Sequence, residues 1–225
     1  MARWWGGQVI RLYHVTKKYG DIRALQDVTV KVAKGEFCYI TGPSGAGKTT
    51  LMKMLYGAQQ PSEGKLLVGG IDVSKLSKRR LPYLRRNIGI VFQDFKLIDR
   101  RTVAENVGLA LDVLGTPKDV VDRRVNAVLG IVGLRGRGDE YPPTLSGGEQ
   151  QRVAVALAIV NDPSILMADE PTGNLDGAMA VEVMEILQAI NLRGTTVLVA
   201  THDTGLMNRF PFRRLRFEAG RLVQS

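Results

Sequence analysis

The sequence holds a single cysteine, Cys38, and only two histidines among 225 residues. One thiol cannot form a disulfide within the chain, which excludes a disulfide scaffold. Its place in an apolar, strand-like stretch favours a small buried side chain over a redox or metal site. A reducing, cytoplasmic setting fits this cysteine usage.

Long hydrophobic runs are also missing. No stretch approaches the roughly 20 apolar residues of a membrane-spanning helix, and residues 1–7 lack the apolar core of a signal peptide. Trp4 and Trp5 precede the first expected strand. They are interpreted either as a membrane-interface contact or as a disordered tail, and we favour the disordered tail. With 44% hydrophobic and 24% charged residues, the composition is that of a soluble globular protein.

Acidic residues are too few to balance the basic ones, since 22 Asp and Glu stand against 31 Lys and Arg, a net charge of +9. The basic residues are scattered in pairs, and no helix or loop collects them with interleaved aromatic residues, so a nucleic-acid surface is weakly supported. The excess of basic residues has two other interpretations. It could belong to an ordinary solvated surface, or to a protein that works beside an anionic membrane leaflet. We favour these two together.

The most informative stretch fits the phosphate-loop pattern G-x-x-x-x-G-K-[ST]; it reads Gly42-Pro43-Ser44-Gly45-Ala46-Gly47-Lys48-Thr49. A strand-like segment, 36–41, precedes it, and a helical pattern of apolar residues follows. Glycines let backbone N–H groups approach phosphate, Lys48 supplies positive charge, and the Thr49 hydroxyl is placed to ligate Mg²⁺. Because a chance glycine-rich turn would lack this context, we predict that the chain binds a nucleoside triphosphate.

Three further strand-like segments end in polar side chains. One ends in Gln93, a second in Asp169 and Glu170, and a third leads to His202. In a phosphate-loop ATPase such an Asp holds Mg²⁺ through water, and the adjacent Glu polarises the attacking water. Gln93 is placed to orient water or touch Mg²⁺, with a plain strand-end residue as the alternative. His202 points to the γ-phosphate, whereas His14 is interpreted as structural.

A second anion site is expected at Leu145-Ser146-Gly147-Gly148-Glu149-Gln150, which precedes a small-residue helix over 151–160. Free N–H groups, the serine hydroxyl and the positive end of the helix dipole all favour an anion. A domain that already holds its phosphates in one loop rarely needs a second phosphate-binding site. We therefore expect this surface to serve the ATP of another copy of the chain.

Alternating apolar residues predict strands over 8–13 and 25–32, with a turn at 16–20 between them. Tyr19 lies in that turn, and two roles stay open for it, packing or stacking on a purine base.

Helical patterns dominate the middle of the chain. A basic stretch, 79–86, is predicted to be helical, and a helical insertion punctuated by glycines is predicted from 102 to about 160. Asp176 is a candidate N-cap for a helix over 177–190.

These motifs stand in the order found in the ATP-binding cassette superfamily, which the chain resembles over nearly its whole length. The resemblance implies an α/β fold of the phosphate-loop NTPase class, with a RecA-like core, an antiparallel β subdomain and a helical subdomain. It implies one domain, 1–225, with the helical subdomain inserted at about 95–160. It also implies an Mg²⁺-dependent ATPase that sandwiches two ATP molecules in a head-to-tail homodimer.

The same resemblance assigns roles to single residues. Catalysis falls to Glu170, His202 and Gln93, and Mg²⁺ to Thr49, Gln93 and, in the outer shell, Asp169. Nucleotide contacts fall to Tyr19 on the adenine, to the phosphate loop, Thr50 and Asp176, and, from the opposite subunit, to Ser146, Gly147 and Gly148.

Residues 92–107 and 171–176 carry a narrower resemblance, to the FtsE family of cell-division ATP-binding proteins. It implies an FtsX-like integral membrane partner, other division proteins, and a peripheral place on the cytoplasmic face of the inner membrane at the division septum. ATP-driven dimerisation would then regulate cell-wall hydrolysis. The alternative is the ATPase of a lipoprotein-release or macrolide-export transporter.

Two other classes are disfavoured. Soluble cassettes that act on ribosomes or DNA usually carry two cassettes or a long coiled-coil insertion, and this chain has neither. A nucleotide sensor without turnover would not need both Glu170 and His202.

Overall fold

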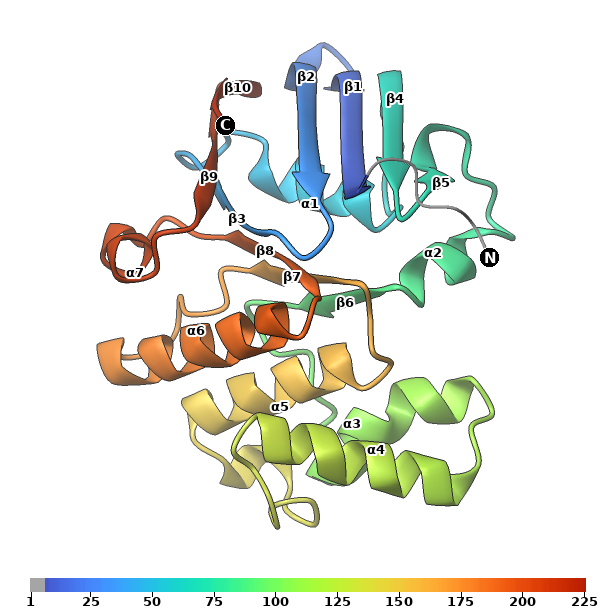
Figure 1. The fold of residues 1–225 in the computed structure, drawn as a ribbon, viewed down its shortest axis with the longest axis vertical. Helices are drawn as coiled ribbons and strands as arrows, with labels where there is room; N and C mark the ends of the chain where they lie inside the picture. Colours follow the sequence, from blue (N-terminus) through green and yellow to red (C-terminus); the bar gives the residue numbers. More distant parts are fainter. Residues whose placement is uncertain (1–6) are drawn as a thin grey trace.

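The computed structural model describes residues 7–225, so Trp4 and Trp5 lie outside the described residues. At its centre is a six-stranded sheet in the order β10-β9-β3-β8-β7-β6 (Figure 1). Its strands are β3 (Phe37–Thr41), β6 (Ile88–Val91), β7 (Ile165–Asp169), β8 (Thr196–Ala200), β9 (Arg213–Glu218) and β10 (Arg221–Gln224). The five strands from β9 to β6 run parallel, and only β10 is antiparallel to its neighbour.

Strands β3, β6, β7 and β8 of this sheet are covered on both faces, which explains why they are nearly continuous apolar runs in the sequence. Successive side chains point to opposite faces. In β3, Phe37 and Tyr39 pack into one buried cluster with the helices that follow β6, whereas Cys38 and Ile40 pack into a second cluster on the other face.

The second cluster lies under a four-stranded antiparallel sheet in the order β2-β1-β4-β5. Its strands are β1 (Gln8–Tyr19), β2 (Ile22–Ala33), β4 (Glu63–Val68) and β5 (Ile71–Asp72). Helix α1 (Lys48–Leu55) supplies Leu51, Met52 and Leu55 to the core that joins the two sheets.

The turn predicted over 16–20 is wrong for most of its length. Strand β1 continues to Tyr19, which pairs with Ile22, and the connection is a two-residue hairpin of Gly20 and Asp21. Irregularities in the β1–β2 register interrupt the regular alternation, so the extent of the strand is hidden in the sequence.

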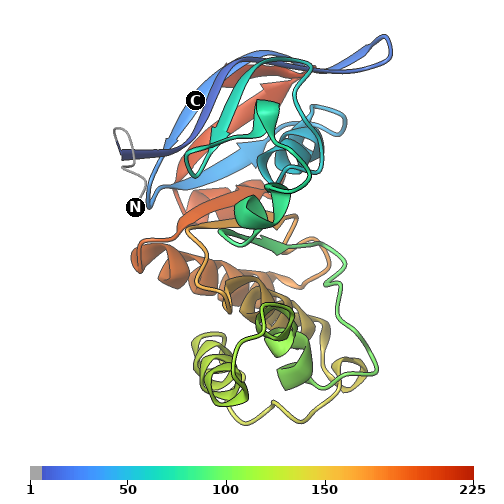
Figure 2. The ribbon, with the colours of Figure 1, turned by 90° about the vertical axis from the view of Figure 1, so that its right-hand side faces the viewer.

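Three helices lie between β6 and β7: α3 (Val103–Val113), α4 (Lys118–Ile131) and α5 (Gly147–Ile159). They form the end of the molecule opposite to the antiparallel sheet (Figure 2). Helix α5 begins four residues earlier than predicted, so the glycines after Ser146 belong to its first turn. Among residues 7–225, no helix combines the length and the apolar character that crossing a membrane requires.

The remaining helices are α2 (Leu81–Arg85), α6 (Gly177–Leu192) and α7 (Thr204–Arg209). Helix α2 is shorter than the predicted 79–86. Pro82 lies in its first turn, where a missing N–H costs nothing, so the helix begins immediately before it. The predicted N-cap of α6 is confirmed, since the Asp176 carboxylate accepts from the Met179 N–H at 2.9 Å.

Candidate functional site

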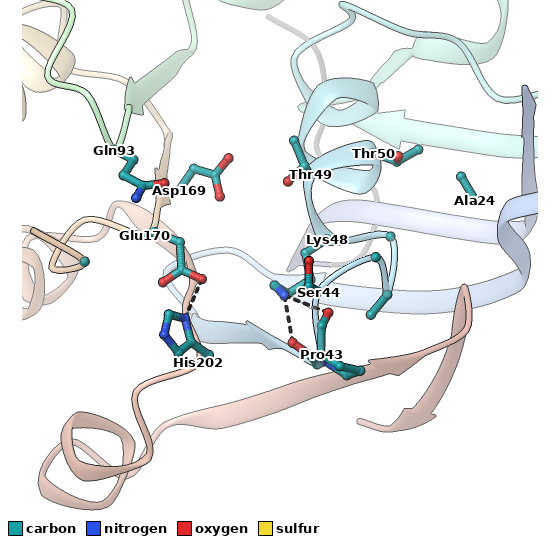
Figure 3. Close-up of a pocket in the computed structure, with 15 residues that line it drawn as sticks. Ala24, Pro43, Ser44, Lys48, Thr49, Thr50, Gln93, Asp169, Glu170 and His202 are labelled. Atoms are coloured by element: carbon teal, nitrogen blue, oxygen red, sulfur yellow. Dashed lines mark hydrogen bonds and ion pairs between the residues drawn. The ribbon is translucent and has the colours of Figure 1, made fainter.

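A cavity of about 730 Å³ lies at the C-terminal edge of the parallel strands (Figure 3). The connection that follows β3 leads to one side of the sheet, whereas the connection that follows β8 leads to the other side. Open α/β sheets bind ligands at the carboxyl ends of the strands where the connections diverge in this way. The lining residues are Ala24, Gly42, Pro43, Ser44, Gly45, Ala46, Gly47, Lys48, Thr49, Thr50, Gln93, Asp169, Glu170, Gly173 and His202. The whole predicted phosphate loop therefore faces the three predicted strand ends.

Two glycines of the phosphate loop have no room for a side chain. Gly42 has φ 141°, and a Cβ there would lie 2.1 Å from the Phe217 carbonyl oxygen. Gly47 has φ 101°, and its Cβ would lie 2.5 Å from the Ala24 carbonyl oxygen. Only glycine tolerates both the backbone conformation and the contact.

Lys48 begins α1 and folds back over the loop. Its Nζ donates to the carbonyl oxygens of Gly42 at 2.7 Å and Pro43 at 3.1 Å. The ammonium group is thus held at the mouth of the loop, opposite Asp169 and Glu170 (Figure 3). Together with the N-terminus of α1, it makes this side of the cavity attractive to phosphate.

Gln93 is exposed and lies two residues after the end of β6. Its backbone carbonyl accepts from the Asn174 side chain at 3.3 Å, and its amide lies 3.6 Å from where a Cβ on Gly173 would be. The loop after β6 is therefore tied to the loop after β7, which brings Gln93 beside the acidic strand end.

Glu170 and His202 meet at the ends of neighbouring strands. His202 Nδ1 lies 3.0 Å from Glu170 Oε1 (Figure 3). Glu170 has φ 48°, a left-handed conformation that is rare for a side-chain-bearing residue. Its N–H donates to the Ala200 carbonyl at 2.9 Å, and its own carbonyl accepts from the Gly173 N–H at 3.1 Å. These bonds hold the carboxylate over the cavity.

Asp169 is partly buried at the end of β7. Burial, and then the charge of Glu170, raise its pKa above the ordinary value, while Lys48 and Lys53 act in the opposite sense. Two carboxylates side by side in a half-buried position favour a cation between them and the phosphate loop.

Among residues 7–225, no group of three or more His, Cys, Asp or Glu side chains could hold a metal. Any ion here would have few carboxylate ligands and would rely on hydroxyl, amide, phosphate and water oxygens. Thr49, Gln93 and Asp169 all line the cavity and supply such groups. Mg²⁺ prefers this donor set, since it binds through one or two carboxylates plus substrate phosphates.

Ser146, Gly147 and Gly148 are not among the residues that line this cavity. Ser146 is exposed and caps α5, where a reciprocal capping box joins it to Glu149. Gly148 allows α5 to approach α6, because a Cβ on Gly148 would lie 2.4 Å from the Met179 sulfur. The helix N-terminus predicted as a second anion site therefore lies outside this cavity, and its binding of an anion stays a prediction.

Tyr19 and Asp176 also lie outside the cavity lining. Tyr19 is 42% exposed at the end of the β1–β2 hairpin, with Lys17 Nζ 4.9 Å from its ring centre. Base stacking by this partly exposed ring stays a prediction. Thr50 does line the cavity.

Two lining residues, Ala24 and Gly173, were not predicted. Ala24 comes from β2 of the other sheet, and no sequence signal places it here. Gly173 lies three residues after Glu170, and its N–H donates to the Glu170 carbonyl oxygen at 3.1 Å.

Comparison with known proteins shows the family of this chain. Residues 25–173 match the family model described as "ABC transporter". The chain is 48% identical over 219 residues to the cell division ATP-binding protein FtsE of Mycobacterium tuberculosis, with 96% of this chain and 95% of that protein covered. It is 46% identical over 215 residues to FtsE of Escherichia coli K12, with 95% and 97% covered.

A solved structure extends the likeness to three dimensions. The dimeric post-hydrolysis state of the ATP-binding cassette MJ0796, bound to ADP and Pi, superposes with a TM-score of 0.85 at 36% identity. The match covers 96% of this chain and 97% of that one. The predicted fold class, an α/β cassette with an antiparallel sheet and helical parts, is confirmed. This chain belongs to the ABC transporter family and is an ATP-binding, ATP-hydrolysing cassette.

Proposed function

We propose that two copies of this chain close head to tail around two ATP molecules, and that each site takes the phosphate loop of one copy and the α5 N-terminus of the other. The observation that carries this proposal is the separation of the two anion sites within one chain. The cavity presents Lys48 and Glu170, whereas Ser146 is exposed and lies outside it. The similar cassette MJ0796 is itself described as dimeric.

Within each site, Tyr19 stacks on the adenine, residues 42–50 bind the phosphates, and Asp176 contributes from its loop. Glu170 polarises the attacking water, and Gln93 and His202 orient water and γ-phosphate. Ser146, Gly147 and Gly148 contact the γ-phosphate of the opposite copy. Mg²⁺, when bound, offsets phosphate charge; Thr49, Gln93 and Asp169 would hold it.

We further propose that residues 1–225 act as one domain, with the helical subdomain at about 95–160 inserted in it.

The insertion carries a groove of about 570 Å³ against α2. Its lining includes the apolar Leu109 and Val113 and the basic Lys78, Arg85 and Arg86, and none of its lining residues is acidic. Val113 is 79% exposed.

The occupant we assign to this groove is a cytoplasmic helix of an integral membrane protein, with an apolar face and acidic residues beside it. Charge complementarity to the basic lining residues favours such a helix. The similarity to FtsE proteins supports an FtsX-like partner. The chain would then lie peripherally on the cytoplasmic face of the inner membrane at the division septum, and ATP-driven closure would regulate cell-wall hydrolysis.

Affinity capture tests this function. Glu170→Gln protein is captured from native membranes in mild detergent, and the bound proteins are identified by mass spectrometry. An FtsX-like membrane protein with division proteins is the expected result. A lipoprotein-release or export permease would replace the cell-division assignment, and no membrane protein at all would contradict the membrane coupling.

A matched pair of variants locates the docking surface. Val113→Glu should lose the membrane protein and keep ATP turnover. Leu192→Glu changes an equally exposed apolar residue, 81% exposed at the end of α6, and should retain the partner. Equal capture by both variants would exclude the groove.

A further inference from the structure

The Glu149 carboxylate accepts two hydrogen bonds from Ser146, one from its backbone and one from its hydroxyl. Its Oε2 accepts from the Ser146 N–H at 2.8 Å and from the Ser146 Oγ at 2.9 Å. These two bonds, the backbone one first, hold the pKa of Glu149 below its ordinary value. A full negative charge therefore lies at the N-terminus of α5, beside a surface that is proposed to receive phosphate.

Arg137 is bound to the other oxygen of the same carboxylate. Its Nη1 donates to Glu149 Oε1 at 2.9 Å, and its Nη2 donates to Glu140 Oε2 at 2.8 Å. Within residues 7–225, Arg137 is the only basic side chain that forms an ion pair with Glu149. The Glu149 side chain is 20% exposed and that of Arg137 37% exposed, so solvent screens this pair less than an open surface pair.

The geometry points to Arg137 as a positioning residue of the ATPase, which acts through Glu149 on Ser146. This inference rests on the role of Ser146 in the opposite site proposed above. The guanidinium offsets the charge of Glu149 and fixes the carboxylate on the side away from its Ser146 contact. The Ser146 hydroxyl is then presented in one orientation, and an approaching phosphate meets less repulsion.

The test compares Arg137→Met with Arg135→Met. Arg135 is an exposed arginine of the same loop and forms no ion pair within residues 7–225. We expect Arg137→Met to lower kcat about tenfold, the size typical of one lost charge-assisted hydrogen bond. Affinity for a fluorescent ADP should not change, because Arg137 does not line the nucleotide cavity. Arg135→Met should turn over normally, and normal turnover of Arg137→Met would overturn the inference.

Rescue separates charge from architecture. Glu149→Gln removes the negative charge and keeps the capping box, since Gln serves equally at the third helical position. The double variant Arg137→Met/Glu149→Gln should recover turnover to within about threefold of Glu149→Gln alone. A loss that Glu149→Gln does not rescue would contradict this role of Arg137.

Arg137→Lys covers the case in which the Met variant folds poorly. Lysine keeps the charge, so turnover should stay within about threefold of the parent, and a loss as large as that of the Met variant would contradict the inference.

Ser146→Arg separates the two proposals. If Ser146→Arg hydrolyses ATP normally, the composite site fails as well; if it is inactive while Arg137→Met is normal, only the inference fails.

Discussion

Glu170 Oε1 and His202 Nδ1 lie 3.0 Å apart, although the two residues are 32 positions apart in the chain. Neighbouring parallel strands β7 and β8 end together, and this register brings the two side chains to one edge of the sheet. The contact is asymmetric, because the Glu170 side chain is 18% exposed whereas that of His202 is 76% exposed. The base candidate is thus enclosed, and the histidine is left exposed.

Glu170→Gln should trap an ATP-bound dimer. The amide still occupies the enclosed position, so ATP and Mg²⁺ can close the two copies, but it cannot take a proton from water. Sedimentation velocity with ATP and Mg²⁺ should show a dimer that persists, whereas the parent chain returns to monomer as ATP is consumed. A Glu170→Gln protein that stays monomeric under these conditions would contradict the composite site.

Lys48→Ala should weaken nucleotide binding by about a hundredfold, since the variant loses charge-assisted hydrogen bonds to phosphate. Titration with a fluorescent ATP analogue measures the loss. Lys53→Ala is the control, because it removes a lysine of the same helix that does not line the cavity. Unchanged affinity in Lys48→Ala would show that the phosphates lie elsewhere.

Ser146→Arg should bind ATP nearly as well as the parent and hydrolyse almost none of it. The large side chain blocks the surface offered to the opposite copy, while the cavity of its own copy stays intact. Mixing Ser146→Arg with Lys48→Ala adds a sharper test. Each mixed dimer contains one site with both halves intact, so ATPase activity should reappear on mixing. If the two proteins, each inactive alone, stay inactive when mixed, both anion sites lie in cis.

Cys38 should resist thiol reagents in the folded protein. It is fully buried in β3, and burial raises the pKa of its thiol from 9.0 to about 12. Because the reactive form is the thiolate, labelling at pH 8 should require unfolding in guanidinium chloride. Rapid labelling of the native protein would contradict the buried position.

The same shift has a consequence at alkaline pH. The unfolded thiol loses its proton from about pH 9 while the folded one keeps it, so the contribution of Cys38 to stability is complete below this pH and declines as the pH rises toward 12. Chemical unfolding at pH 8 and pH 10.5 measures the decline, which should be smaller in Cys38→Ala. An equal decline in both proteins would assign it to other groups.

Much of the site could be predicted from the sequence because its parts are local. A phosphate loop is one turn between a strand and a helix, so residues 42–49 carry the pattern by themselves. Gln93, Asp169 and His202 could be placed at strand ends because each follows an apolar run. Those runs are continuous because the strands are covered on both faces of the sheet. Ser146 at a helix N-terminus was likewise a local capping pattern.

Other features were decided only by the tertiary structure, because they depend on contacts between distant segments. Strand β2 carries Ala24 to the cavity from a separate sheet, and the irregular pairing of β1 with β2 extends the strand to Tyr19. The ion pair of Arg137 with Glu149 joins a loop to a helix whose relative placement no periodicity encodes. The sequence by itself determined the chemistry of this protein through short motifs; long-range register and packing decided which of those groups share one site and which are left exposed for another molecule.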